Sequence, residues 1–339
     1  MTVNGVHAPK TPPQLLSASS GAGKAGRRAP KALPLPKGRK SHALPQRHDG
    51  KLEKMPDLIR DKIGRIESPF AIQEEARRGL ILKIQNSAHC DVAVLYHNLE
   101  CPHSILDDGD AEMLEGVLSA NRPKRPLLLI INSNGGLPLA AERLVHVARS
   151  YAPKGFRTMV VQKAKSAATM ICLGSDQIYM TKTSELGPID PQILGFDKSQ
   201  RISVDSYLGA YDKLMSDVRA LDMNEENPSG LLHRLNRFDA AHVEEMRKVR
   251  ELGRDMAEKF LNEFMLKGTE KEKIDEVVQA FCESAKHKSH GRPIWASEAK
   301  ALGLNITIMN PTSVIWKSSY ELIQRYDHLC MLRQLSDSE

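Results

Sequence analysis

Cysteine is scarce in this sequence and follows no paired spacing. The chain has 339 residues, and its five cysteines are an odd number scattered along it: Cys90, Cys101, Cys172, Cys282 and Cys330. Secreted domains that depend on disulfides space their cysteines in pairs. We therefore expect no disulfide framework, and a reducing compartment is favoured.

Long apolar runs are also missing. The longest, such as Leu127 to Ile131, fall far short of the ~20 residues that span a bilayer. No apolar core follows the basic start of the chain, as a secretory signal would require. We expect a soluble, cytoplasmic protein without a transmembrane segment.

Aromatic residues make up only 5% of the chain, although hydrophobic residues reach 41% and charged residues 27%. The last two values are close to the averages of globular proteins, so wholesale disorder and fibrous repeats are excluded. A core poor in aromatics must be filled by Leu, Ile, Val, Ala and Met, as in layered α/β folds.

Acidic residues are nearly absent from the start of the chain. Residues 1–56 hold 11 Lys or Arg but only Asp49 and Glu53 as acids, although the net charge of the whole chain is +6. The remainder is therefore mildly acidic, which gives the folded part no nucleic-acid footprint. The segment is rich in Pro, Gly and Ser and too polar to offset the entropy of ordering. We expect a disordered basic arm, suited to an acidic or anionic partner.

After this arm, helical and strand patterns alternate. Parallel sheets covered by helices on both faces have this alternation. Beyond Pro191 the pattern becomes helical, with a periodic apolar face from Val204 to Val218 and another long segment from Ala240 to Leu266. The expected elements before Pro191 are a helix after Pro69, a strand over 91–96, a helix capped by Asp107, a strand over 126–132, a helix over 138–150, a strand over 157–162, a short helix from Ser166 and a strand over 177–180.

Two strand ends carry residues suited to chemistry. The first runs Ile130-Ile-Asn-Ser-Asn-Gly-Gly136, where glycines let backbone N–H groups face a developing oxyanion. The second runs Ala164-Lys-Ser-Ala-Ala-Thr-Met170 and places Ser166 at the start of a helix among small residues. A serine there is often only a helix N-cap, but successive ends of parallel strands meet at one edge of a sheet, where such folds bind ligands.

These two turns, together with Ser184-Glu-Leu-Gly-Pro-Ile-Asp-Pro-Gln192, resemble the serine dehydrogenase proteinase family, related to signal peptide peptidase A and the Clp proteolytic subunit. The resemblance covers roughly residues 60 to 310 and includes the ending Leu302-Gly-Leu-Asn305. The three motifs occur in the order that the family requires.

The resemblance implies a Clp/crotonase-like α/β spiral of ββα units with additional C-terminal helices. It implies a serine peptidase that needs no cofactor or metal, with Ser166 as nucleophile and the N–H groups of Gly136 and Ala167 as oxyanion donors. Its substrates would be peptides or unfolded proteins, and its assembly a homo-oligomer. We expect the disordered arm over 1–56, the peptidase domain over 57–310 with a helical insertion at about 200–285, and a C-terminal tail or helix over 311–339.

The general base is less clearly marked. Clp subunits carry a histidine about 25 residues after the serine, but this chain has Asp190 there. Signal peptide peptidases use a lysine about 50 residues after the serine, and Lys213 is near that spacing, so we predict Lys213 as the base. Lys163, Lys165 and His290 remain alternative candidates for the base.

Two other functions remain open at this stage. An enzyme of the same superfamily that acts on an acyl thioester would keep the oxyanion turn but need no serine nucleophile. A catalytically degenerate relative would serve as an interaction protein through its basic arm. His89, Cys90, His97, Cys101 and His103 include potential zinc ligands, but their spacing matches no ligand pattern, so we expect no metal site.

Overall fold

The computed structural model describes residues 70–101, 103–194, 201–221, 227–283 and 289–336. The predicted basic arm, residues 1–56, lies outside the described residues. All described residues belong to one compact unit, Pro56–Glu339. They contain every strand and helix that the sequence patterns predict after Pro69.

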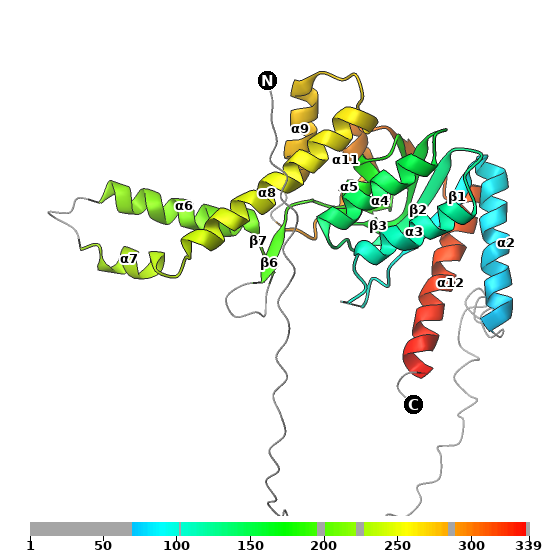
Figure 1. Ribbon diagram of the computed structural model, residues 1–339, viewed down its shortest axis with the longest axis horizontal. Helices are drawn as coiled ribbons and strands as arrows, with labels where there is room; N and C mark the ends of the chain where they lie inside the picture. The colour runs from blue at the N-terminus through cyan, green and yellow to red at the C-terminus, as the bar shows by residue number, and fades with distance from the viewer. Residues whose placement is uncertain (1–69, 102, 195–200, 222–226, 284–288, 337–339) are drawn as a thin grey trace, which may run out of the picture. The chain divides into compact units, whose positions relative to one another are not determined.

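The centre of this unit is a seven-stranded sheet (Figure 1). Its main path is parallel throughout, and the apolar run of β2 is buried along its whole length, as expected for a strand covered on both faces. The strands in spatial order are β1 (Asp91–Tyr96), β2 (Leu127–Ser133), β3 (Phe156–Ala164), β4 (Gln177–Met180) and β9 (Ile306–Ile308), with β5 (Glu185–Leu186) beside the end of β3 and β8 (Ile294–Trp295) antiparallel to β5.

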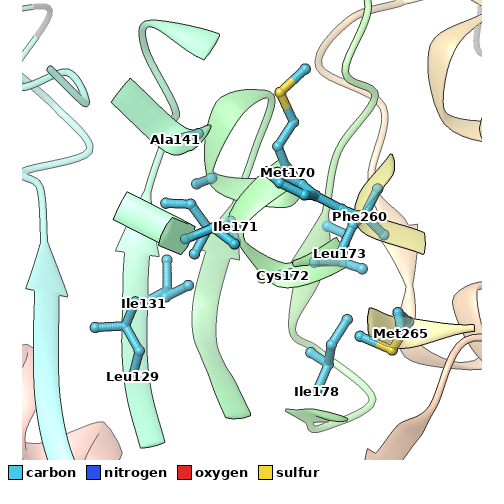
Figure 2. Close-up of a cluster of buried hydrophobic side chains, with 14 of the residues drawn as sticks. Leu129, Ile131, Ala141, Met170, Ile171, Cys172, Leu173, Ile178, Phe260 and Met265 are labelled. Carbon is cyan, nitrogen blue, oxygen red and sulfur yellow. The ribbon is translucent and has the colours of Figure 1, made fainter. Parts of the chain in front are cut away.

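Helices cover both faces of the sheet. On one face, Leu129 and Ile131 of β2 pack with α3 (Asp108–Ala120), α4 (Pro138–Tyr151) and α5 (Ala167–Leu173). Figure 2 shows this cluster, in which the apolar side chains of α5 lie between β2 and the residues Phe260 and Met265. Because successive strand residues point to opposite faces, Leu128 and Ile130 pack on the other side. The predicted α/β fold with a parallel sheet is confirmed.

The second face is covered by the two ends of the described chain. α2 (Phe70–Ala88) packs against α12 (Val314–Ser336), and Trp316, Leu322 and Ile323 of α12 are buried with Ile84. The segment predicted as a C-terminal tail or helix therefore forms part of a core layer. Among the described helices, none combines the length and the apolar character that crossing a membrane requires.

The segment between the sheet strands β5 and β8 is mainly helical. Its first part has a small core of its own, whereas Phe260 and Val277 farther along belong to the main core. Tyr207 and Leu208 of α6 pack against Val243 and Met246 of α8. The elements of this part are the antiparallel strands β6 (Gln192–Leu194) and β7 (Arg201–Ser203), α6 (Val204–Ala220), α7 (Ser229–Leu235), α8 (Ala240–Phe260), the π-helical turn η2 (Leu261–Met265) and α9 (Lys271–Cys282), and α11 (Ala296–Ala301) follows β8.

Arg149, near the end of α4, is expected to contribute strongly to stability. Its guanidinium donates to Gly174 O (2.7 and 3.1 Å) and Asp176 Oδ1 (2.7 Å) and lies 4.0 Å from the centre of the Phe264 ring. We predict that Arg149→Ala lowers the free energy of unfolding in urea by about 3 kcal/mol, because Gly174 O and Asp176 lose charge-assisted hydrogen bonds. The control is Arg143→Ala, since Arg143 forms only an exposed pair with Glu112, for which less than about 0.5 kcal/mol is expected. Equal losses in the two variants would contradict this role.

Candidate active site

The turn after β2 lies directly against Ser166. Gly135 has φ of +91°, and a Cβ there would lie only 2.9 Å from Cβ of Ser166 and would overlap the carbonyl oxygen of Lys165. A Cβ on Gly136 would overlap the backbone of Leu106. Any side chain at either position would push the turn away from its neighbours. The two glycines are therefore required by the contact between the turn and the start of α5.

Ser166 has a backbone conformation that residues with a side chain rarely adopt. Its φ and ψ are 50° and −121°, and among the described residues only one other non-glycine, His89, has a positive φ. Ser166 occupies the N-cap position of α5, but its side chain makes no capping hydrogen bond. A strained turn with a free serine hydroxyl between a strand and a helix is typical of nucleophilic serines. The geometry favours a nucleophile over a simple N-cap.

Backbone donors lie next to this serine. The ideal Cβ position of Gly135 is 3.0 Å from the Ala167 nitrogen, so the glycine turn touches the start of α5. Within the described part of the chain, the N–H groups of Gly136 and Ala167 donate no main-chain hydrogen bond. The two predicted oxyanion donors therefore lie in one region, and neither N–H group is used in a main-chain hydrogen bond of the described residues. An N–H group must be unbonded in this way to bind an oxyanion.

Asp190 is buried and contacts the imidazole of His290, which is partly exposed. Oδ1 of Asp190 lies 2.8 Å from Nδ1 of His290, and only 1% of the Asp190 side chain is exposed. Its Oδ2 is buried and has no hydrogen-bond partner among the described residues. A buried carboxylate that contacts Nδ1 fixes the orientation of the imidazole and leaves Nε2 for another group. An imidazole oriented in this way is suited to act as a general base.

The segment that leads to Asp190 runs along α5. The N–H of Gly187 donates to Oγ1 of Thr169 at 3.1 Å, and a Cβ on Gly187 would lie 2.6 Å from Cδ of Lys165. Asp190 follows three residues later, at the position where the spacing of Clp subunits would place a histidine. From the sequence alone, His290 is only an alternative candidate for the base and Asp190 has no assigned role, although Asp190 lies in the third family motif. The pairing of the two residues could not be read from their separation of 100 positions.

A cavity opens beside this pair. It has a volume of about 840 Å³ and is lined by Asp190, Gln192, Arg201, Ser206, Ser289 and His290. The volume is within the range of ligand-binding pockets.

Lys213 lies elsewhere. It is exposed on α6 and lines a smaller cavity of about 280 Å³ together with Asp217, Arg234 and Arg237. α6 packs against α7 and α8 and lies apart from α5 in Figure 1. The structure therefore does not bring Lys213 to Ser166 within one chain, and its role as the base stays a prediction.

Lys165, held in reserve as a base, is engaged in another contact. Its Nζ lies 2.8 Å from Glu185 Oε2 and donates to Leu186 O at 3.0 Å. Burial lowers the pKa of Lys165 and outweighs the opposing effect of Glu185, so the pKa lies below its usual value. The ammonium nevertheless fixes the β5 segment beside α5, which is a structural role. Lys163 lies on β3 opposite Glu185 in the parallel ladder.

The residues considered as zinc ligands do not form a metal site. Over the described ranges, no group of three His, Cys, Asp or Glu side chains is placed to hold an ion. His97 instead contacts Ser133 and Asp110.

Part of the chain matches a known protein family. Residues 74–217 match the family of serine proteinases described as ClpP-like and SDH-type. This segment contains the glycine turn, Ser166 and Asp190, whereas His290 lies beyond it. The resemblance to the serine dehydrogenase proteinase family that the motifs predict is confirmed over these residues.

Individual relatives are distant. Two uncharacterized proteins of Methanocaldococcus jannaschii are similar to this chain: MJ0137 is 29% identical over 125 residues (35% of this chain, 43% of the relative), and MJ1495 is 23% identical over 218 residues (64% of this chain, 62% of the relative). The chain thus spans less than two thirds of the length of either relative. A mutant of the membrane-bound stomatin-specific protease 1510-N is similar at 14% identity over 36% of this chain and 60% of that chain, with a TM-score of 0.28.

Proposed function

We propose that this protein is a serine peptidase that hydrolyses peptide bonds through an acyl-enzyme on Ser166. The observation that carries the proposal is the strained backbone of Ser166, with a hydroxyl that caps no helix and a glycine turn packed against it. Strain of this kind is kept where the surrounding structure enforces it for function. The family match over residues 74–217 supports the same reaction class.

In the proposed reaction, Oγ of Ser166 attacks the carbonyl carbon of the scissile peptide bond. His290 accepts the hydroxyl proton at Nε2, while Asp190 holds Nδ1–H and stabilises the imidazolium that forms. The oxyanion of the tetrahedral intermediate is bound by the N–H groups of Gly136 and Ala167. The intermediate then breaks its C–N bond, and the leaving amine takes the proton from His290. Water activated by the same imidazole hydrolyses the ester.

His290 replaces Lys213 as the base in this proposal because of where the two side chains lie. His290 is oriented by a buried carboxylate that follows the segment packed along α5. Lys213 is exposed on α6, where it lines a cavity together with Asp217 and two arginines, so it lacks the burial that a lysine base needs. A lysine base needs a desolvated environment to lose its proton near neutral pH.

We also propose that the substrates are peptides or unfolded proteins and that the protein assembles as a homo-oligomer. The cavity of about 840 Å³ beside His290 supports a polypeptide substrate. The oligomer rests on the resemblance to Clp-like peptidases, in which assembly restricts access to the site.

Covalent labelling tests the reaction class. We expect a fluorophosphonate probe to label the native protein at one serine, identified as Ser166 by mass spectrometry of the digested product, because the probe reacts only with an activated hydroxyl beside oxyanion donors. Heat-denatured protein is the control and should remain unlabelled. Labelling of a different serine, or no labelling of the native protein together with no cleavage of an unfolded casein substrate, would contradict the proposed function and favour a thioester-binding or degenerate relative.

A further inference from the structure

A serine, a histidine and an aspartate lie in contact where β1 and β2 end beside the first turn of α3. Nδ1 of His97 is 2.7 Å from Oγ of Ser133, and Nε2 of His97 is 3.2 Å from Oδ2 of Asp110. His97 is 7% exposed, and Ser133 is completely buried. These distances resemble those of a catalytic triad, but no substrate can reach the Ser133 hydroxyl.

The Ser133 hydroxyl instead holds the glycine turn. Its Oγ accepts the N–H of Gly135 at 3.0 Å, and Gly135 is the residue that packs against Ser166. A turn with two glycines has many accessible conformations, so each hydrogen bond to it restricts the direction of the Gly136 N–H. The turn is held from its other side by Leu106, whose N–H donates to Gly135 O at 2.9 Å.

One arrangement of protons satisfies every member of this network. Gly135 N–H donates to Ser133 Oγ, and the Ser133 hydroxyl then donates to Nδ1 of His97. His97 Nε2–H donates to the Asp110 carboxylate, which also accepts the N–H of Asp107 at 2.9 Å. A proton on Nε2 of His97 therefore completes the chain of bonds. Donors and acceptors in a fully satisfied buried network rigidify the backbone they hold.

Asp110 is held in its ionised form. Burial raises the pKa of Asp110, but the hydrogen bonds from His97 and from the N–H of Asp107, together with the electrostatic attraction of His97, outweigh burial, and the pKa lies below its usual value. The carboxylate is thus ionised at neutral pH and accepts both bonds.

We propose that His97 and Ser133 are positioning residues for the oxyanion turn. They fix Gly135, and through it direct the Gly136 N–H toward the carbonyl oxygen of the substrate bound at Ser166. The role rests on the proposed peptidase function for its catalytic consequence. The hydrogen-bond chain from Asp110 to Gly135 stands on the geometry alone.

Two substitutions of His97 separate this role from a merely structural one. Asparagine places an amide oxygen near the position of Nδ1 and retains an acceptor for Ser133, whereas glutamine places its amide near Nε2 and retains the contact with Asp110. If His97 acts through Ser133, His97→Gln should lower kcat of peptide hydrolysis by about 10–100-fold, less than the ~10²–10³-fold lost when an oxyanion donor is removed. His97→Asn should keep a kcat about tenfold above that of the glutamine variant, with KM within about twofold in both.

A structural tether between β1 and α3 predicts the reverse order, because glutamine keeps the bond to Asp110. Ser133→Ala should match the glutamine variant, since it removes the acceptor for Gly135. The serine control is Ser119→Ala, because Ser119 is exposed on α3 and donates to Gly116 O within the same helix, and it should leave kcat unchanged. Equal kcat in the two His97 variants, or a change confined to KM, would overturn the proposal.

Hydrogen exchange tests the same inference without relying on peptidase activity, so it does not depend on the proposed function. Amide hydrogen exchange of Gly135, measured by NMR, should be faster by about tenfold or more in Ser133→Ala than in the wild type, because the acceptor of its N–H is removed. Exchange should also be faster in His97→Gln than in His97→Asn, because glutamine no longer holds the Ser133 hydroxyl in place. If the wild-type protein hydrolyses no peptide, the proposed function fails while the exchange data still decide the inference. Unchanged exchange in Ser133→Ala would refute the hydrogen-bond chain.

Discussion

Replacing Ser166 with glycine is expected to abolish catalysis while making the protein more stable. The φ of 50° and ψ of −121° at Ser166 strain a residue that has a side chain, at a cost of roughly 1–3 kcal/mol. Glycine relieves this strain but adds about 0.5–1 kcal/mol of chain entropy to the unfolded state. We predict that Ser166→Gly raises the free energy of unfolding by about 1 kcal/mol and lowers kcat by at least ~10³-fold.

Thermal unfolding of the unliganded protein and fluorophosphonate labelling check the two halves of this prediction. Ser166→Ala should lose labelling in the same way but gain no stability, because alanine retains the Cβ that is strained. His89→Gly is the matched backbone control, since His89 has φ of 51° and lies two residues before β1, at the opposite end of the strand from His97. It should leave labelling unchanged. If Ser166→Gly is no more stable than Ser166→Ala, the strain does not exist.

The elements of the sheet were predictable because their residues carry local signals. The run from Leu127 to Ile131 is apolar without interruption and becomes a strand that is buried on both faces. Asp107 was predicted to cap a helix, and it forms a capping box with Asp110 at the start of α3. Ser166 could be singled out because a strand ending, small residues and a helix start follow each other directly in the sequence.

The partners of the candidate site were not predictable in the same way. Asp190 meets His290 across 100 positions, and His97 meets Ser133 across 36. Neither pair has a local pattern, because each forms only when the sheet and its connections fold. Spacing taken from relatives pointed to Lys213, but the residues between Ser166 and Lys213 include a hairpin and much of α6, which carry the lysine away from α5.

The second large effect is expected when His290 is removed. His290→Ala should lower kcat by about 10³–10⁴-fold with little change in KM, because the Ser166 hydroxyl loses its base and Asp190 loses the group it orients. Asp190→Asn should produce a similar loss, because the asparagine amide can donate to Nδ1 of His290 and so favour the tautomer whose proton is on Nε2, which cannot accept the serine proton. The matched histidine control is His146→Ala, because His146 is exposed on α4. Steady-state hydrolysis of an unfolded casein substrate measures all three variants.

Lys213→Ala decides between the two bases. We expect kcat within about threefold of the wild type, as for a change to an exposed lysine distant from the reacting groups. If Lys213→Ala instead abolishes activity while His290→Ala does not, the base must reach Ser166 from α6 of a second copy, because α6 lies apart from α5 within one chain. Mixing the inactive Ser166→Ala and Lys213→Ala proteins would then restore activity, since each would supply the residue that the other lacks. No such rescue is possible if His290 and Ser166 act within the same chain.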